Sequence, residues 1–146
     1  MSIEIRKALP ADAEGIFKVE GICSGEPWTL PEIEEELAFS QAYTVAALQD
    51  GAIIGFCTIQ YAMESAHINE FGVLPDCRRQ GIGQRLLEEI FRFCRENGVQ
   101  ELTLEVRTGA APARAVYDRN GFVQVGKRKN FYTGPSEDAL VLKKNI

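Results

Sequence analysis

The sequence contains few of the residues that bind metal ions or build disulfide frameworks. It has one histidine, His67, and four cysteines that form no Cys-x-x-Cys pair: Cys23, Cys57, Cys77 and Cys94. Structural metal sites and disulfide frameworks need such residues in closely spaced groups. We therefore expect no metal and no disulfide framework, and we expect Cys57 and Cys94, which lie in apolar patterns, to be small core residues.

Long apolar runs and an excess of positive charge are also missing. No run approaches the ~20 residues of a membrane-spanning helix, and residues 1–7 lack the apolar centre of a signal peptide. The net charge of −5 argues against a nucleic-acid-wrapping surface and leaves a basic peptide as a suitable partner. We therefore expect a cytoplasmic protein that contacts neither membrane nor nucleic acid.

The order of predicted elements defines the fold class. The 146 residues, 45% of them hydrophobic, suit one folded domain with its own core. Periodicities predict a strand, two helices, three strands, a helix, a strand, a helix and two strands. The strand at 102–106 should run parallel to that at 67–73, because a long helix crosses between them. This is an α/β (α+β) fold with a mixed, mostly antiparallel seven-stranded sheet and helices on both faces.

Between a strand ending at Val73 and a helix beginning near Ile82 lies a segment rich in arginine and glycine. Helix starts offer unpaired amides and a positive dipole end, and glycines without β-carbons let a phosphate approach them. The segment has no Gly-Lys-Ser/Thr, and Leu86 stands where a dinucleotide fingerprint needs a small residue. A pyrophosphate site and an ordinary strand-to-helix turn with solvated arginines are both consistent with the residues Arg78-Arg79-Gln80-Gly81-Ile82-Gly83.

Two later residues are candidates for acid–base chemistry. Glu105 lies on the strand face opposite Leu104 and Val106. If helices cover that face, burial would raise the pKa of Glu105 and suit it to a general base; if the face is open, Glu105 is a solvated carboxylate. Tyr117 lies in the following helix, where packing on the sheet is the alternative to catalysis. Each residue alone is better explained by structure than by chemistry.

Taken together, these segments resemble the GNAT acetyltransferases. Arg78-x-x-Gly81-x-Gly83 fits the Arg/Gln-x-x-Gly-x-Gly/Ala pattern of the acetyl-CoA loop of that family. The second half of the family core is matched by a strand at 104–107 and by Ala-x-x-x-Ala-x-Tyr-x-x-x-Gly-Phe at 111–122. Pro27-Trp28 and Asn130-Phe131-Tyr132 further resemble one branch, the bacterial ribosomal-protein-alanine N-acetyltransferases, which acetylate the N-terminal alanine of ribosomal protein S18. The likeness spans the chain and implies that residues 1–146 form a single N-acetyltransferase domain.

The resemblance implies a role for each matched position. Glu105 would remove the proton of the acceptor ammonium, and Tyr117 would protonate the departing CoA thiolate. An α-ammonium group with a pKa of roughly 8 must lose a proton before it attacks, which gives the first role a chemical reason. Acetyl-CoA, the co-substrate, would be bound by the backbone of Phe71, Gly72 and Val73 and by the loop residues Arg78, Arg79, Gln80, Gly81, Ile82, Gly83 and Gln84.

Three functions are compatible with these residues. The first is direct acetyl transfer to the N-terminal alanine of S18; the second has a small-molecule amine or a lysine side chain as acceptor; the third is a non-catalytic acyl-CoA-binding module. Glu105 and Tyr117 argue against the third, since a binder needs neither. The choice of acceptor depends on the loops around Trp28 and Tyr132. The alternative role for Trp28 is a hydrophobic anchor between two helices. Ala110 stands where the branch usually has a CoA-contacting asparagine, so Ala110 is left out of the predicted site.

Overall fold

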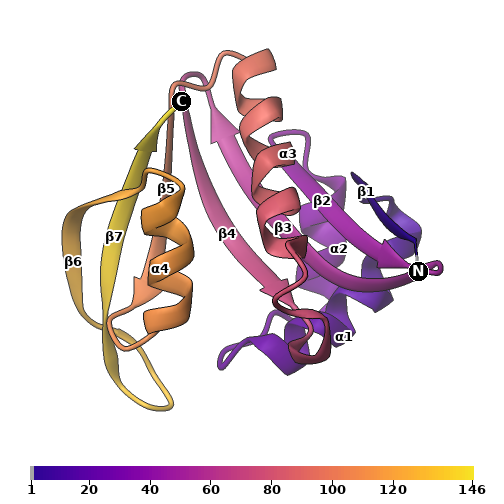
Figure 1. The fold of residues 1–146 in the computed structure, drawn as a ribbon, viewed down its shortest axis with the longest axis horizontal. Coiled ribbons are helices and arrows are strands. Elements are labelled where there is room, and N and C mark those ends of the chain that lie inside the picture. The colour runs from indigo at the N-terminus through magenta and orange to yellow at the C-terminus, as the bar shows by residue number, and fades with distance from the viewer. Residues whose placement is uncertain (1) are drawn as a thin grey trace.

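A single sheet organises the chain, in the strand order β1-β2-β3-β4-β5-β7-β6 (Figure 1). The computed structural model describes residues 2–146. Neighbouring strands are antiparallel except β4 and β5, which are parallel, so the predicted fold class is confirmed. The elements are β1 (Ile3–Lys7), α1 (Ala13–Cys23), α2 (Leu30–Ala38), β2 (Ala42–Gln49), β3 (Ala52–Ala62), β4 (Ser65–Val73), α3 (Ile82–Glu96), β5 (Glu101–Arg107), α4 (Ala111–Arg119), β6 (Val123–Tyr132) and β7 (Glu137–Asn145).

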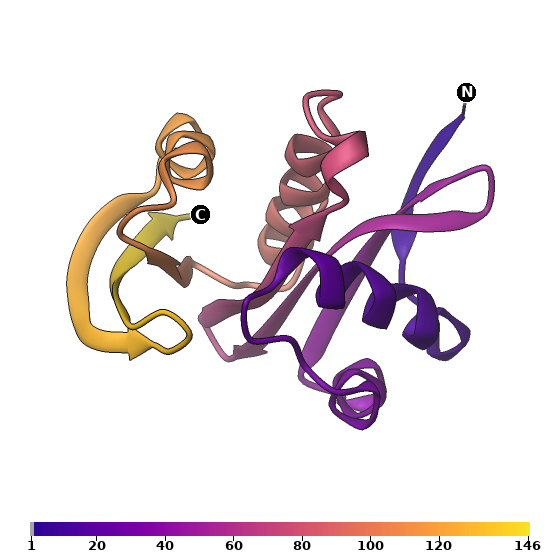
Figure 2. The ribbon, with the colours of Figure 1, turned by 90° about the horizontal axis from the view of Figure 1, so that it is seen from below.

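Helices cover both faces of the sheet. Figure 2 shows α3 and α4 on one face and α1 and α2 on the other. In α3, Ile82, Leu86, Ile90 and Cys94 recur every fourth residue, a spacing that predicts one apolar stripe. This stripe is buried and packs with Cys57, Leu102 and Leu104 in the larger core cluster. Cys57 and Cys94 are buried free thiols, as expected. Within residues 2–146, none of the helices combines the length and the apolar character needed to cross a membrane.

The last hairpin is longer than the sequence predicts. We expected strands at 122–126 and 139–143 with a loop from 130 to 137, but β6 extends to Tyr132, which pairs with Glu137. The register shifts between Arg128 and Tyr132, and Asn130 there has a φ of 52°. Asparagine tolerates this left-handed conformation, so an irregularity in a strand resembled a loop in the sequence.

Two irregularities of β4 shape the site. β4 pairs with β5 only from Ser65 to His67, and Figure 1 shows the two strands diverging beyond that point. The register with β3 also shifts so that Glu70 faces Thr58 and Ile68 faces Ile59, which leaves Asn69 as an extra residue, a β-bulge. The first irregularity opens a gap in the sheet, and the second changes which side chains face it.

Candidate active site

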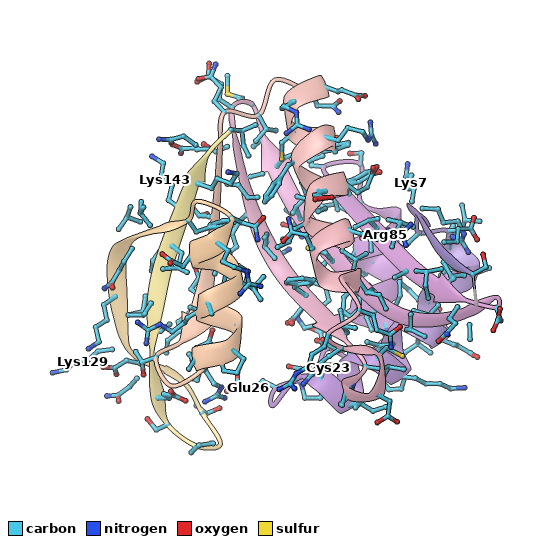
Figure 3. The ribbon with its side chains drawn as sticks, viewed as in Figure 1. Lys7, Cys23, Glu26, Arg85, Lys129 and Lys143 are labelled. Carbon is cyan, nitrogen blue, oxygen red and sulfur yellow. The ribbon has the colours of Figure 1, made fainter. Side chains whose placement is uncertain are left out.

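A cleft of about 510 Å³ lies where β4 and β5 separate. Its wall is built from the α1–α2 loop, β4, β5, α4 and β6, so segments distant in the sequence meet there. One side of the cleft is closed where the α1–α2 loop meets the β6–β7 loop, because the Thr133 amide donates to Glu26 over 2.6 Å. Figure 3 shows Glu26 beside Cys23, below the gap between α3 and α4. The lining side chains with polar or aromatic character include Trp28, Glu70, Phe71, Glu105, Tyr117 and Tyr132.

Glu105 projects into this cleft from β5 and is hydrogen bonded to the only histidine. His67 Nε2 lies 3.0 Å from Glu105 Oε1, and His67 Nδ1 lies 2.6 Å from Thr103 Oγ1. An ionised carboxylate only accepts hydrogen bonds, so Nε2 is the donor and, in the neutral ring, Nδ1 accepts from the Thr103 hydroxyl. The ring is thereby held at both nitrogens, and it fixes the direction of the Glu105 carboxylate.

We expected burial to give Glu105 a raised pKa, but the net shift of its pKa is downward. The side chain is only 16% exposed, and burial does act to raise the pKa. The hydrogen bond from His67 is the larger effect and holds the pKa of Glu105 below its ordinary value. Glu105 is therefore ionised at neutral pH and can accept a proton without first losing one.

Tyr117 of α4 is both a packing residue and a cleft residue. It is 8% exposed, its ring lies 5.5 Å from that of Phe122 and 6.3 Å from that of Phe71, and it also lines the cleft. Burial raises the pKa of Tyr117 well above its ordinary value, so the hydroxyl keeps its proton at neutral pH. The two alternatives from the sequence, packing and proton donation, are thus compatible in one residue.

The N-terminus of α3 forms the end of the loop that was predicted to bind pyrophosphate. Gly81 precedes the helix with a φ of 76°, and no side chain caps the helix. The first-turn amides of an uncapped helix are free to bind an anion, and glycine adopts the left-handed turn without strain. Arg78 is partly engaged, because its Nε donates to the Val73 carbonyl over 2.9 Å and ties the loop to the end of β4.

Gly83 lies where the start of α3 meets β4. The expectation that its missing β-carbon admits a phosphate stays a prediction. A β-carbon there would lie 3.4 Å from Cζ of Phe71, which is an ordinary van der Waals contact. Next to it, the Gln84 amide group exchanges hydrogen bonds of 2.8 and 2.9 Å with Asn120 and thereby links α3 to α4 across the two halves of the sheet.

The predicted backbone site on β4 lies beside these groups. Because β5 has already diverged, the edge of β4 from Ile68 to Val73 has no strand partner on that side among residues 2–146. Phe71 contacts the position of Gly83 and packs near Tyr117. The structure thus brings Phe71–Val73, the start of α3 and Tyr117 together on the α3 side of the cleft. Glu105 and His67 lie on the α1 side.

Sequence reasoning missed one residue that lines the cleft, Glu70, and two residues that act on lining carboxylates, His67 and Glu20. His67 was considered only as a metal ligand, and Glu70 and its partner Glu20 were not considered. Two residues three apart in a regular strand point to opposite faces, whereas the bulge at Asn69 places His67 and Glu70 on the same face. A bulge leaves no reliable mark in the sequence. Trp28, by contrast, lines the cleft and also packs against the α1–α2 cluster, so it combines both interpretations.

The sheet splits between two parallel strands, and the glycine-led start of α3, Glu105 and Tyr117 lie beside the opening, as in an acetyltransferase fold. The profile of the acetyltransferase (GNAT) family matches residues 13–122. The chain belongs to the acetyltransferase (GNAT) family. Among residues 2–146, no three side chains of the kinds that bind metals are grouped to hold an ion.

Two similar sequences and one solved structure are named as ribosomal protein S18-alanine N-acetyltransferases. The chain is 31% identical over 139 residues to a putative ribosomal protein bS18-alanine N-acetyltransferase of Bacillus subtilis, covering 94% of this chain and 92% of that one. It is 31% identical over 136 residues to the ribosomal protein bS18-alanine N-acetyltransferase of Escherichia coli, covering 90% and 89%. The crystal structure of the E. coli S18-alanine enzyme superposes with a TM-score of 0.93 at 28% identity, over 99% of this chain and 94% of that one.

Proposed function

We propose that this chain transfers an acetyl group directly from acetyl-CoA to the α-amine of the N-terminal alanine of ribosomal protein S18. The observation that carries the proposal is the position of Glu105, held by His67, and of protonated Tyr117 in one cleft. A proton acceptor and a proton donor are needed together only if a reaction occurs. The choice of acceptor is supported by the relatives named as S18-alanine N-acetyltransferases, since the similarity covers most of their length.

The side chains suit the two proton transfers that the reaction requires. Glu105 accepts a proton from the acceptor ammonium, directly or through a water, and the freed lone pair attacks the thioester carbon. His67 keeps the accepting oxygen in place. Tyr117 donates its proton to the thiolate that departs, since a thiol with a pKa near 8.5 leaves as an anion. Backbone amides along β4 would stabilise the oxyanion that forms at the carbonyl.

The cofactor would lie across the gap in the sheet. Its pyrophosphate would bind the first-turn amides of α3, with Arg79 and the backbone of Gly81, Gly83 and Gln84 around it. Its pantetheine arm would add to the open edge of β4 at Phe71–Val73, where strand-like hydrogen bonds are available. This placement directs the thioester toward Tyr117 and the Glu105 side of the cleft.

An acetylation assay with three acceptors tests the proposal. Enzyme and acetyl-CoA are offered a peptide with an S18 N-terminus beginning in alanine, the same peptide with its α-amine blocked and a lysine present, and a polyamine. We expect a mass gain of one acetyl group on the first peptide alone. The same gain on the blocked peptide or the polyamine would instead support the lysine or small-amine acceptor.

Tight binding of acetyl-CoA without turnover on any acceptor would leave the third alternative, an acyl-CoA-binding module. A double variant with Glu105→Gln and Tyr117→Phe is the matched control, since it should bind acetyl-CoA but transfer nothing. A wild-type protein that is no more active than this control on every acceptor contradicts the proposal.

A further inference from the structure

Two carboxyl groups that the acetyl-transfer chemistry leaves unused interact with each other beside the cleft. Glu20 lies on α1 and is 2% exposed, while Glu70 lies on β4 and lines the cleft. Glu20 Oε2 also accepts from the Trp28 amide over 3.0 Å. Two neighbouring buried carboxyl groups do not both ionise readily, so the pair holds one proton between two acids.

The bulge in β4 gives this pair its place in the site. It puts Glu70 on the face that carries His67, and His67 holds Glu105 there. Gly72, two residues on, faces α1, since a β-carbon at Gly72 would lie 3.0 Å from Cβ of Cys23. The α1 side of the cleft therefore carries the acid pair and the proposed base. The opposite side carries the α3 start and Tyr117.

The charged groups around the pair do not compensate a second negative charge. Glu26, Glu32 and Glu36 act on it from the α1–α2 segment, and all three are acidic. Arg107 also lines the cleft, but it bonds Glu137 and stacks over Tyr132. The thiol of Cys23 and the guanidinium of Arg78 bond the Val73 carbonyl at the end of β4.

Burial and the neighbouring carboxylates raise the pKa of Glu70 to about 8 and also raise the pKa of Glu20. With the cleft empty, the pair therefore keeps its proton at neutral pH. Tyr117 and Tyr132, the other titratable groups near Glu70, also stay neutral, because burial raises the pKa of each. The acid pair therefore has no cationic partner among the groups named above.

We propose that the Glu20–Glu70 pair is the anionic anchor of the acceptor's α-ammonium group, and that acceptor binding releases the proton of the pair to solvent. The inference rests on the proposed function, because that function supplies an ammonium as the acceptor. An ammonium has three N–H donors, and Glu70 and Glu105 line the same cleft. Its charge replaces the proton, the pair becomes fully ionised, and Glu105 then removes a proton from the bound ammonium.

Calorimetry of the complex with CoA, which has no acetyl group to transfer, measures proton release directly. The S18-type peptide is titrated into CoA-saturated enzyme at pH 7 in phosphate and in Tris, whose ionisation enthalpies differ. We expect wild type to release about one proton per peptide, since an acid with a pKa of about 8 is mostly protonated at pH 7. Equal heats in the two buffers for wild type would overturn the proposal.

Substitution of Glu70 distinguishes specific anchoring of the peptide ammonium from a general effect of negative charge on peptide binding. In Glu70→Gln, the amide donates to Glu20, which stays ionised, so no proton is available for release. We expect proton release to vanish and KM for the peptide to rise at least tenfold, with a smaller change in kcat. Glu34→Gln, the same substitution at an exposed position on α2, should keep the wild-type KM and proton release. A Glu70 variant with wild-type KM and proton release would sink the idea.

Substitution of Glu20 tests the coupling within the pair. Glu20→Gln removes the neighbouring charge but can still accept from Trp28, so Glu70 should ionise at lower pH. We expect this variant to release little proton when the peptide binds at pH 7, and its KM for the peptide should lie between those of wild type and Glu70→Gln. Undiminished release would contradict a shared proton. Failure of the proposed function is a separate outcome, because wild type would then leave the peptide unacetylated whatever the pair does.

Discussion

His67 Nε2 lies 3.0 Å from Oε1 of Glu105 and joins β4 to β5 at the point where the two strands begin to separate. The contact sets the direction of the carboxylate and keeps it ionised. In the proposed function Glu105 is the general base, which must be within reach of the proton that it removes, and its orientation depends on a residue from another strand. The pair would then link the geometry of the sheet to proton transfer.

Glu105→Gln should lower kcat/KM by ~10²-fold or more at neutral pH, because the amide cannot accept the ammonium proton. Raising the pH from 7 to 9 should recover part of the loss, since more of the acceptor amine is already neutral. Initial rates with the S18-type peptide across this range check the prediction. Near-wild-type rates at pH 7 would remove Glu105 from the mechanism.

Tyr117→Phe should depress kcat and leave acetyl-CoA binding nearly intact. The ring keeps its packing against Phe122 and Phe71, but the proton for the leaving thiolate is lost. The raised pKa of Tyr117 keeps its hydroxyl protonated, so we expect no loss of kcat from ionisation of Tyr117 below pH 9. Single-turnover rates together with acetyl-CoA affinity provide the measurement, and an unchanged kcat would assign Tyr117 to packing alone.

Regular patterns predicted most of the fold and part of the site. Alternation in 102–107 gave the face of Glu105, and helical spacing gave the buried stripe of α3. The long crossover between Val73 and Leu102 was enough to predict a parallel pair, because the connection rule is independent of side-chain detail. These features depend on residues close together in the sequence or on topology.

The missing part of the site depends on register. The contact of His67 with Glu105 needs β4 and β5 to pair from Ser65 to His67, and the position of Glu70 needs the bulge at Asn69. Neither has a local sequence signature. The direction of the pKa shift of Glu105 was missed for the same reason, since burial was visible in the pattern and the histidine partner was not.

Stability should fall as pH rises because of Glu70. Its pKa in the folded protein is about 8, above the ordinary glutamate value of 4.5, so the folded state holds a proton that the unfolded state has lost. This contribution is complete below about pH 4.5 and disappears as pH rises through 8. Carboxyls with a lowered pKa, such as Asp12 and Glu105, lose their contribution only as pH falls below the ordinary range.

Thermal unfolding between pH 5.5 and 8.5 isolates this effect. We expect the Tm of wild type to decrease over the interval and that of Glu70→Gln to decrease less, with the variant the more stable of the two at pH 8.5. Glu34→Gln should follow wild type. Parallel curves for wild type and Glu70→Gln would show that Glu70 titrates normally.

Gly83→Val should weaken acetyl-CoA binding at least tenfold, or ~1.4 kcal/mol. The structure adds a second consequence, because the β-carbon alone would lie 3.4 Å from Cζ of Phe71 and a branched side chain needs more room. The start of α3 must then shift away from β4, so the Tm should fall as well. Gly21→Val in α1, where a β-carbon meets nothing within 4 Å, is the control for the cost of valine in a helix. Wild-type affinity in folded Gly83→Val would show that this turn does not hold the cofactor.

Ala110→Asn tests the position at which the sequence departs from the pattern that the family resemblance leads us to expect. Ala110 is the residue before the first turn of α4, and no side chain caps that helix. An asparagine there has two uses. It can bond a polar group of CoA, worth about 0.5 to 1.5 kcal/mol, or it can cap α4, worth about 0.5 to 2 kcal/mol of stability.

We expect the CoA contact to form, so the Kd of acetyl-CoA should fall a few fold while kcat hardly changes, because the contact exists equally in the ground and transition states. Ala110 also packs against the larger core cluster, which limits how far the new side chain can turn inward. Calorimetric Kd and Tm measured on the same samples distinguish the two uses. A higher Tm with an unchanged Kd would mean that the asparagine caps the helix and that the cofactor contact is not restored.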